Sequence, residues 1–358
     1  MHVMMKRSYN QDIRLFAHAS QVFWYAVLAV AVLAAPAVLN EYYLSQLTFV
    51  AIYSIAGVGL MLLAGHTGQI SLGHAAFLAA GAYAEAILQA RGVPFALSFL
   101  VAGAIAGLLG VVVGLPAARL SGIYLAIATL AFAFIVEEVL ARWETVTRGN
   151  SGIAVGGLAI GPVAIDAEWK FYYLCVGLLV LVMLGAINLL RSRTGRAFVA
   201  IRDSEIAARS LGINLARYKT IAFAASATLT GLAGALYSHR ILFVSPDQFT
   251  ILVSVELLVL VVVGGLGSLH GAVFGAAFVV MLPQAIVLAK AVSGLGAASQ
   301  AGLNAGLYGL MLVLFMLFEP HGLYGRWLKI KLYLDIFPFY RKATFKRQRV
   351  FQKSERLK

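Results

Sequence analysis

The sequence predicts an all-α polytopic membrane protein with about ten transmembrane helices, and two observations lead to this prediction. Apolar residues make up 61% of the 358 residues and charged residues only 12%, whereas soluble domains carry about 45–50% and about 25%. Long stretches also contain no Asp, Glu, Lys or Arg, and the two longest are 42–84 and 257–289. Each such stretch can hold at least one membrane span, which needs about 20 apolar residues.

Ten segments are predicted to cross or enter the membrane, and eight to eleven crossings fit the sequence. The range comes from 42–90 and 252–290, where Gly-rich joints interrupt the apolar runs and produce short or broken segments. The first segment follows a basic start but is longer than the apolar run of a secretory signal, about 7–15 residues, so we expect an uncleaved span. The ten segments are 22–39, 46–64, 74–90, 96–116, 122–140, 171–190, 220–238, 252–264, 272–289 and 303–318.

The distribution of basic residues predicts that both termini lie in the cytoplasm. Residues 1–21 hold three Lys or Arg, 191–219 hold seven, and 326–358 hold eleven. Positive residues in short loops favour the cytoplasmic side, and an even number of spans between these segments places all three there. We therefore predict a cytoplasmic N-terminal segment (1–21), a transmembrane domain (22–325) and a basic cytoplasmic tail (326–358). Within the domain, 141–170 form a periplasmic loop and 191–219 a cytoplasmic loop.

No motif in the sequence points to catalysis, a metal ion or a cofactor. The chain has neither the phosphate loop of ATPases nor the common metalloprotease and hydrolase motifs. The single cysteine, Cys175, excludes a disulfide within the chain and a zinc site built on cysteine spacing. The Gly-rich run 264–271 lies in an apolar segment, so a sharp turn or broken helix is favoured over a nucleotide loop. The net charge is +13, and the basic residues that produce it flank the spans. This position predicts contact with membrane lipid and no nucleic-acid partner.

Polar residues inside the predicted spans are candidate positions on a transport pathway, because such residues are costly in the membrane. The joint 65–74 is polar and Gly-rich and contains Gln69, Ser71 and His74. Broken segments of this kind often line a pathway, although a plain loop fits the same residues. Glu256 is the deepest acidic residue, and it fits either a place on the substrate path or a structural hydrogen bond.

Glu85 has a different expected place. It follows a long uncharged stretch and precedes Arg91 by six positions. We expect Glu85 at the outer membrane interface, near Arg91, because an interfacial carboxylate avoids the cost of burial in the membrane.

Six short motifs occur in the order in which a known family carries them, over about 50–358. Each motif is weak alone, but the six together are specific. They are G-Q-I-S-L-G-H-A-A-F at 68–77, S-G-I-Y-L-A-I-A-T-L-A-F at 121–132, T-R-G-N-S-G-I at 147–153, G-R-A-F at 195–198, G-G-L-G-S at 264–268 and F-E-P-H-G-L at 318–323. The sequence therefore resembles the LivM-type permeases of branched-chain amino acid ABC importers. Thr129, in the second motif, becomes a further pathway candidate.

The resemblance implies a permease subunit of an ATP-driven, binding-protein-dependent importer that moves Leu, Ile and Val across a bacterial inner membrane. Such a permease pairs with a second, LivH-type permease and with two cytoplasmic ABC ATPase subunits. A periplasmic substrate-binding protein delivers the cargo. ATP hydrolysis is then expected on the separate ATPase subunits, so this chain is not expected to be an enzyme.

The cytoplasmic loop is where the resemblance places contact with the ATPase. Many ABC importers carry the pattern E-A-A-x-x-x-G there, and the A-A-x-x-x-G portion is present in this chain. Ile206 replaces the glutamate of the pattern, and Glu205 precedes it by one position. A purely topogenic role for the loop arginines is the alternative, and Gly212 is expected to end a helix. The predicted coupling residues are Arg202, Asp203, Glu205, Ala207, Ala208 and Gly212.

Two alternatives for the function stay open at this point. Urea, amides or aromatic acids fit the same importer class, since the binding protein sets much of the selectivity. An ion-coupled secondary transporter is a candidate from another class, with Glu256 and His74 as its possible coupling residues. A membrane-embedded enzyme is disfavoured, because the sequence has no cluster of His, Asp or Glu at ligand spacing.

Overall fold

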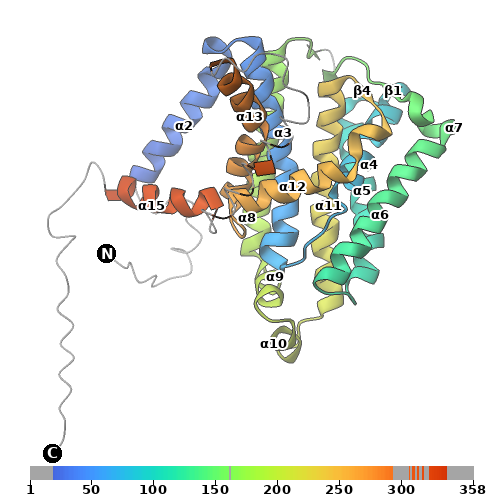
Figure 1. The fold of residues 1–358 in the computed structure, drawn as a ribbon, viewed down its shortest axis with the longest axis vertical. Coiled ribbons are helices and arrows are strands. Elements are labelled where there is room, and N and C mark those ends of the chain that lie inside the picture. Colours follow the sequence, from blue (N-terminus) through green and yellow to red (C-terminus); the bar gives the residue numbers. More distant parts are fainter. Residues whose placement is uncertain are drawn as a thin grey trace, which may run out of the picture. The chain divides into compact units, whose positions relative to one another are not determined.

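The computed structural model describes residues 19–160, 163–292 and 322–336, with isolated positions between 306 and 317. The chain divides into two compact units, which we describe separately. The larger unit covers 35–325, and the smaller one includes α2 (Ala19–Val38) up to Ala34 and α15 (Gly322–Ile336) from Arg326. Helices joined by short connections make up most of what Figure 1 shows. The tenth predicted segment, 303–318, lies mostly outside the described residues.

Apolar helices dominate the described chain, which confirms an all-α polytopic membrane protein. Among the described residues, seven helical segments are long and apolar enough to cross a membrane, and α4 (His74–Ala90) is a shorter helix of 17 residues. The seven lie in α3 with η1 (Glu41–Leu60 and Met61–His66), α5 (Phe95–Ala117), α6 (Ile123–Arg142), α8 (Glu168–Arg191), α11 (Leu215–Ile241), η3 with α12 (Pro246–Phe249 and Ile251–Gly264) and α13 (Leu269–Val292). The first nine predicted segments all correspond to described helices. The number of crossings and the side of the termini stay predictions.

Helix α11 packs against α3, α4 and α5 in the larger unit. Its contact with α4 depends on residues without side chains. A Cβ atom at Gly81 would lie 2.0 Å from the carbonyl oxygen of Gly231, and one at Gly234 would lie 2.0 Å from that of Leu78. In a lipid environment helices associate through close packing and not through the hydrophobic effect. The small residues of α4 and α11 therefore allow the backbone contact that joins these two helices.

Two Gly-rich breaks interrupt the helices of the larger unit where the sequence predicts them. Helix α3 continues into the π-helix η1, and a joint of residues 67–73, irregular from Gly68 on, precedes α4. Helices α12 and α13 are joined by a tight turn in which Gly265 and Gly267 have φ angles of 110° and 86°. This confirms a turn at the second break. The two breaks lie together, because a Cβ atom at Gly65 would be 2.7 Å from the amide nitrogen of Gly267.

Two long connections lie at opposite ends of the larger unit (Figure 1). The connection from α6 to α8 contains α7 (Glu144–Thr147), η2 (Gly149–Ser151), β1 (Ile153–Ala154), β2 (Ala159–Ile160) and β3 (Val163–Ala164). Strand β1 pairs antiparallel with β4 (Phe243–Val244), and β2 pairs antiparallel with β3. The connection from α8 to α11 contains α9 (Arg193–Asp203) and α10 (Glu205–Ser210). The predicted loops 141–170 and 191–219 correspond to these connections, and the side of the membrane on which each lies stays a prediction.

Candidate transport site

His74, the first residue of α4, is fully buried and has a partner at each ring nitrogen. The two nitrogens lie 3.1 Å from the hydroxyl oxygen of Ser71 and 2.8 Å from that of Ser226 on α11. A neutral imidazole has one donor and one acceptor, and a hydroxyl can serve as either. The two serines can therefore satisfy the ring. This side chain attaches the joint 67–73 to α11.

Thr129 on α6 holds the same joint. Its hydroxyl accepts a hydrogen bond from the Leu72 amide at 3.0 Å and donates to the Ala126 carbonyl oxygen at 3.0 Å. Ser254 on α12 accepts from the Ala75 amide at 2.9 Å. The first amides of a helix have no partner within it, and here another helix supplies one. We use the name α4 anchor for Ser71, His74, Thr129, Ser226 and Ser254.

Gln69 lies in the joint and has unused hydrogen-bonding capacity. The residue is 3% exposed, and neither its Nε2 nor its Oε1 atom has a partner among the described residues. Its backbone amide donates to the Leu63 carbonyl oxygen at 3.1 Å, which fixes the position of the residue. An unpaired buried polar group costs about 1–3 kcal/mol. The side-chain amide could instead pair with a carboxylate through its donor and an ammonium through its acceptor.

Glu256 on α12 does not join the α4 anchor. Ser254 contacts α4, and residues two positions apart on a helix do not face each other. Glu256 is half-buried, and its carboxylate has no hydrogen bond or ion pair with the part of the chain that the structure describes. The structure therefore brings three of the five predicted pathway residues together beside Gln69 and leaves Glu256 on another face.

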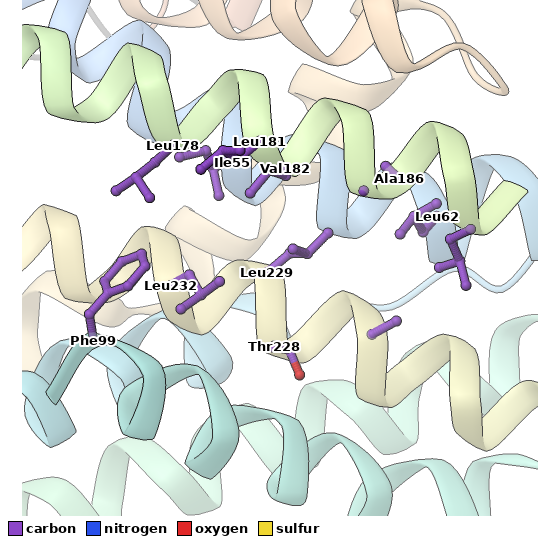
Figure 2. A pocket seen from close by; sticks show the side chains of 13 residues that line it. Ile55, Leu62, Phe99, Leu178, Leu181, Val182, Ala186, Thr228, Leu229 and Leu232 are labelled. Carbon is purple, nitrogen blue, oxygen red and sulfur yellow. The ribbon is translucent and has the colours of Figure 1, made fainter. Parts of the chain in front are cut away.

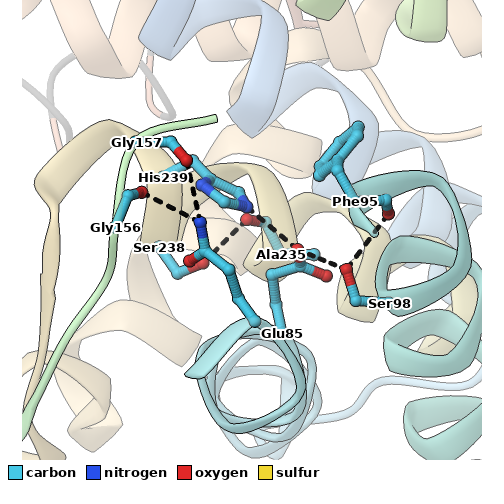
Figure 3. Close-up of polar contacts among 9 residues, drawn as sticks. Glu85, Phe95, Ser98, Gly156, Gly157, Ala235, Ser238 and His239 are labelled. Atoms are coloured by element: carbon cyan, nitrogen blue, oxygen red, sulfur yellow. Dashed lines mark hydrogen bonds and ion pairs between the residues drawn. The ribbon is translucent and has the colours of Figure 1, made fainter. Parts of the chain in front are cut away.

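Glu85 lies in the interior of the larger unit, where it contacts Ser98 and His239, and its expected place at the outer membrane interface near Arg91 stays a prediction. Its side chain is fully buried, and Oε1 accepts from the Ser98 hydroxyl at 2.7 Å (Figure 3). The same oxygen lies 2.9 Å from Nε2 of His239 on α11. Histidine can supply a compensating charge, which is the condition for keeping a carboxylate away from water. Glu85 Oε2 and His239 Nδ1 have no partner among the described residues.

One turn further along α4, Gln89 connects this helix to the α6–α8 connection. Its Nε2 atom donates to the carbonyl oxygens of Gly156 at 3.1 Å and Gly157 at 3.0 Å, as Figure 3 shows. Helix α4 is thus bonded at its start to the α4 anchor and at its end to one of the two long connections. A displacement of the 156–157 segment would act directly on α4.

An apolar cavity of about 430 Å³ lies between α8 and α11, with side chains from α3 and α5 also lining it (Figure 2). Among its lining side chains the one hydroxyl, on Thr228, donates to the Ala224 carbonyl oxygen of its own helix at 2.8 Å. A charged group buried there would have no partner, and an unpaired buried charge is strongly unfavourable. The cavity is therefore unsuited to a zwitterionic amino acid.

Three capping side chains set the path of the α8–α11 connection. The Ser192 hydroxyl caps α9, the Ser204 hydroxyl caps α10, and the Asn214 side chain caps α11, each by accepting from a backbone amide of the helix that follows. Such caps contribute about 1 kcal/mol each. Gly212 has a φ angle of 81° just beyond α10, which confirms its predicted role as a helix stop.

Helix α10 has one side turned toward the neighbouring helices and one side exposed. Ala208 is 1% exposed and packs in a small apolar cluster, whereas Ala207 is exposed. Ile206 and Leu211 are 85% and 78% exposed. The other exposed residues of this connection are polar or small.

Glu205, the residue next to the position where the family pattern has its glutamate, faces the helices. Its Oε1 atom lies 2.7 Å from Nζ of Lys219 at the start of α11. The same ammonium group donates to the Leu120 carbonyl oxygen at 3.4 Å. Glu205 thus attaches α10 to α11 and to the connection between α5 and α6.

Arg202, at the end of α9, also faces the helices. Its Nη1 atom donates to the Gly65 carbonyl oxygen of η1 at 3.2 Å. Its Nε and Nη2 atoms donate to Oδ1 of Asp203 at 3.2 Å and 3.0 Å. Asp203 is 65% exposed, so it holds the guanidinium from the solvent side. The predicted coupling residues therefore divide into inward-facing and outward-facing groups.

The partners of these side chains are not evident from the sequence. Lys219 counts there only as one of the basic residues of a loop, and Ser226, Ser254 and His239 belong to none of its motifs. One signal was available, because a Lys or His next to an apolar run needs a partner if the helix is buried. Within the described ranges, no group of three or more His, Cys, Asp or Glu could hold a metal ion.

Comparison with known proteins identifies a family that this chain matches. The family described as the permease component of the branched-chain amino acid transport system matches residues 42–316. The chain is 35% identical over 328 residues to the high-affinity branched-chain amino acid transport system permease protein LivM of Escherichia coli K12, covering 85% of this chain and 74% of the relative. It is 34% identical to LivM of Salmonella typhimurium over the same shares. The autoinducer 2 import system permease protein LsrC of Enterobacter sp. 638 is 30% identical over 70% of this chain and 74% of its own length.

Proposed function

We infer that this chain, which belongs to the family of branched-chain amino acid transport permease components, is the membrane permease subunit of a branched-chain amino acid importer. It is a multi-pass protein of the bacterial inner membrane. The observation that carries this conclusion is the similarity to LivM along most of the chain. The proposed cargo is leucine, isoleucine and valine.

The finer organisation of the importer belongs to the same proposal. This chain forms half of the membrane pathway, and a second, LivH-type permease forms the other half. Two cytoplasmic ABC ATPase subunits hydrolyse ATP, and a periplasmic binding protein delivers the amino acid. The chain crosses the membrane about ten times with both termini in the cytoplasm, and its basic tail, 326–358, lies on anionic lipid. The support for this topology is the placement of 21 of the 28 Lys and Arg residues in three segments.

The α8–α11 connection is the proposed contact with the ATPase. Ile206 and Leu211 offer two exposed apolar side chains beyond the end of the helices, and desolvated apolar groups contribute strongly to protein interfaces. Glu205 and Arg202 are bonded to the helices on the other side of the connection. The connection therefore has an outward surface for a partner and an inward attachment to the pathway.

Within the pathway, Gln69 and Glu256 are the residues we propose to meet the cargo. Both have polar groups without a partner among the described residues. Ser71, His74 and Thr129 serve a different role in this proposal, because their polar groups are already occupied in holding the joint 67–73.

Uptake of labelled leucine by cells with and without this gene tests the function. Unlabelled valine, urea and benzoate serve as competitors in the same assay. Loss of uptake on deletion, with competition by valine alone, is the expected result. Uptake that persists after deletion would contradict the branched-chain cargo. Competition by urea or benzoate would indicate a cargo of another chemical class.

An uncoupler added at constant ATP distinguishes the importer from an ion-coupled transporter. Leucine uptake should persist in the uncoupler and should stop when ATP is depleted. Uptake that stops in the uncoupler while ATP is maintained would favour the ion-coupled alternative.

A further inference from the structure

Helix α3 ends in a π-helix at the point where Arg202 contacts it. All six residues of η1 are buried, and π-helical turns occur frequently at functional sites. Because the chain leaves the helix after His66, the last carbonyl groups of η1 need donors from outside the helix. The Gly65 carbonyl oxygen accepts from Arg202 instead. A positive charge at a helix C-terminus is also favoured by the helix dipole.

The Arg202 side chain lies against both Gly-rich breaks. A Cβ atom at Gly68 would be 3.1 Å from Cγ of Arg202, and one at Gly267 would be 3.5 Å from its Nη1 atom. Gly68 and Gly267 have φ angles of 71° and 86°, values that glycine adopts without strain. The Gly267 amide also lies 3.2 Å from the sulfur of Met61 in η1. Arg202 thus occupies the place where the joint 67–73 and the α12–α13 turn meet.

Toward the partner side, Arg202 is two residues from the cap of α10. Oδ1 of Asp203 accepts from two nitrogens of the guanidinium group, and such charge-assisted hydrogen bonds are stronger than neutral ones. Ser204 then begins α10, whose Ile206 is exposed. A displacement of α10 therefore acts on Arg202 through a very short stretch of chain.

We propose that Arg202 is a positioning residue that transmits movement of α10 to the two Gly-rich breaks, so that movement of the docked ATPase changes the shape of the pathway. This inference rests on the proposed function, because it takes α10 as the ATPase contact. Arg202 touches neither cargo nor ATP in this scheme. If the guanidinium group of Arg202 is removed, the ATPase should stay docked and should hydrolyse ATP, but leucine should not be moved.

The test uses the complete importer in proteoliposomes with its binding protein, where leucine uptake and phosphate release are measured together. Arg202→Met keeps an apolar stem over Gly68 and removes the donors, Arg202→Gln is a second variant that also removes the charge, and Arg202→Lys keeps a charged donor. Arg193→Ala is the matched control, because Arg193 is an exposed arginine of the same helix. We expect at least a tenfold fall in leucine moved per ATP for the Met and Gln variants, partial recovery with Lys, and the normal ratio for the control.

The outcomes separate the inference from the proposed function. An unchanged ratio in Arg202→Met and Arg202→Gln, or an equal fall in Arg193→Ala, would overturn the inference alone. Loss of the ATPase subunits during purification from both Arg202→Met and Arg202→Gln would overturn the inference as well, in favour of a purely structural role for Arg202. A wild-type complex without ATP-driven leucine uptake would overturn the proposed function together with the inference.

Discussion

Glu205 and Lys219 form an ion pair whose partners have opposite surroundings. The Lys219 side chain is 2% exposed and the Glu205 side chain 41%, with 2.7 Å between Nζ and Oε1. Within the described residues, the ammonium group has one further partner, the Leu120 carbonyl oxygen at 3.4 Å. A charge held away from water depends on its partner, whereas a half-exposed carboxylate can be hydrated. The lysine therefore depends on the pair more than the glutamate does.

Glu205→Gln is expected to lower the stability of the protein more than Lys219→Met. The first variant leaves a buried ammonium group without its counter-charge, at about 1–3 kcal/mol. The second leaves a carboxylate that water can reach, at about 1 kcal/mol or less. Thermal unfolding in detergent of both single variants and the double variant measures this, and the double should resemble Lys219→Met. A larger loss in Lys219→Met than in Glu205→Gln would contradict the asymmetry.

His239→Ala is expected to destabilise the protein by about 3–5 kcal/mol, because it removes the histidine partner of the buried Glu85 side chain and, among the described residues, leaves only the Ser98 hydroxyl bonded to it. Glu85→Gln should cost less, since the amide oxygen can still accept from the Ser98 hydroxyl. Unfolding by SDS in mixed micelles compares the two variants. The double variant Glu85→Met with His239→Leu should recover part of the loss, and equal losses in the two single variants would argue against a charged pair.

Gly81→Ala is expected to cost about 1–3 kcal/mol, the usual range for overpacking. The added Cβ atom would lie 2.0 Å from the Gly231 carbonyl oxygen, so α4 and α11 would have to separate. Gly177→Ala is the matched control, because Gly177 also lies in a helix and a Cβ there meets nothing within 4 Å. That control should be neutral or stabilising by up to about 1 kcal/mol. The melting temperatures of the two variants test this prediction, and indistinguishable values would contradict the close approach of α4 and α11.

Gln69→Leu is expected to raise stability and reduce transport at the same time. Leucine has a similar size and removes two unpaired buried polar atoms, whose burial costs about 1–3 kcal/mol. Because misfolding cannot explain a loss of transport in a more stable variant, the pair of measurements isolates the contact with cargo. Leucine uptake and the melting temperature are measured on the same preparation. Normal uptake in Gln69→Leu would remove this residue from the pathway.

Ile206→Asp is expected to leave stability within about 0.5 kcal/mol of the unmodified protein, as exposed substitutions usually do. It should nevertheless abolish recovery of the ATPase subunits with the tagged permease, because a charge replaces an apolar contact. Ile206→Leu is the control and should retain the subunits. Undiminished recovery with Ile206→Asp would place the ATPase contact elsewhere.

The positions of the helices and breaks could be predicted from the sequence because their causes are local. A bilayer requires apolar runs of a set length with internally bonded backbones, so the first nine predicted segments correspond to helices. Gly212 could be recognised as a helix stop, and 264–271 as a turn, because glycine enters conformations that other residues avoid. The predicted tenth segment, 303–318, lies mostly outside the described residues.

A helical membrane protein with glycine-rich breaks can be predicted from the sequence, because apolar length and backbone freedom are properties of neighbouring residues. Which polar groups meet depends on the packing of distant helices. Glu85 and His239 are 154 positions apart, and His74 and Ser226 are 152 positions apart. Such pairs cannot be predicted from a local sequence pattern, since they depend on how closely α4 and α11 approach each other. That approach places Glu85 among buried side chains, which the residues around it in the sequence do not indicate.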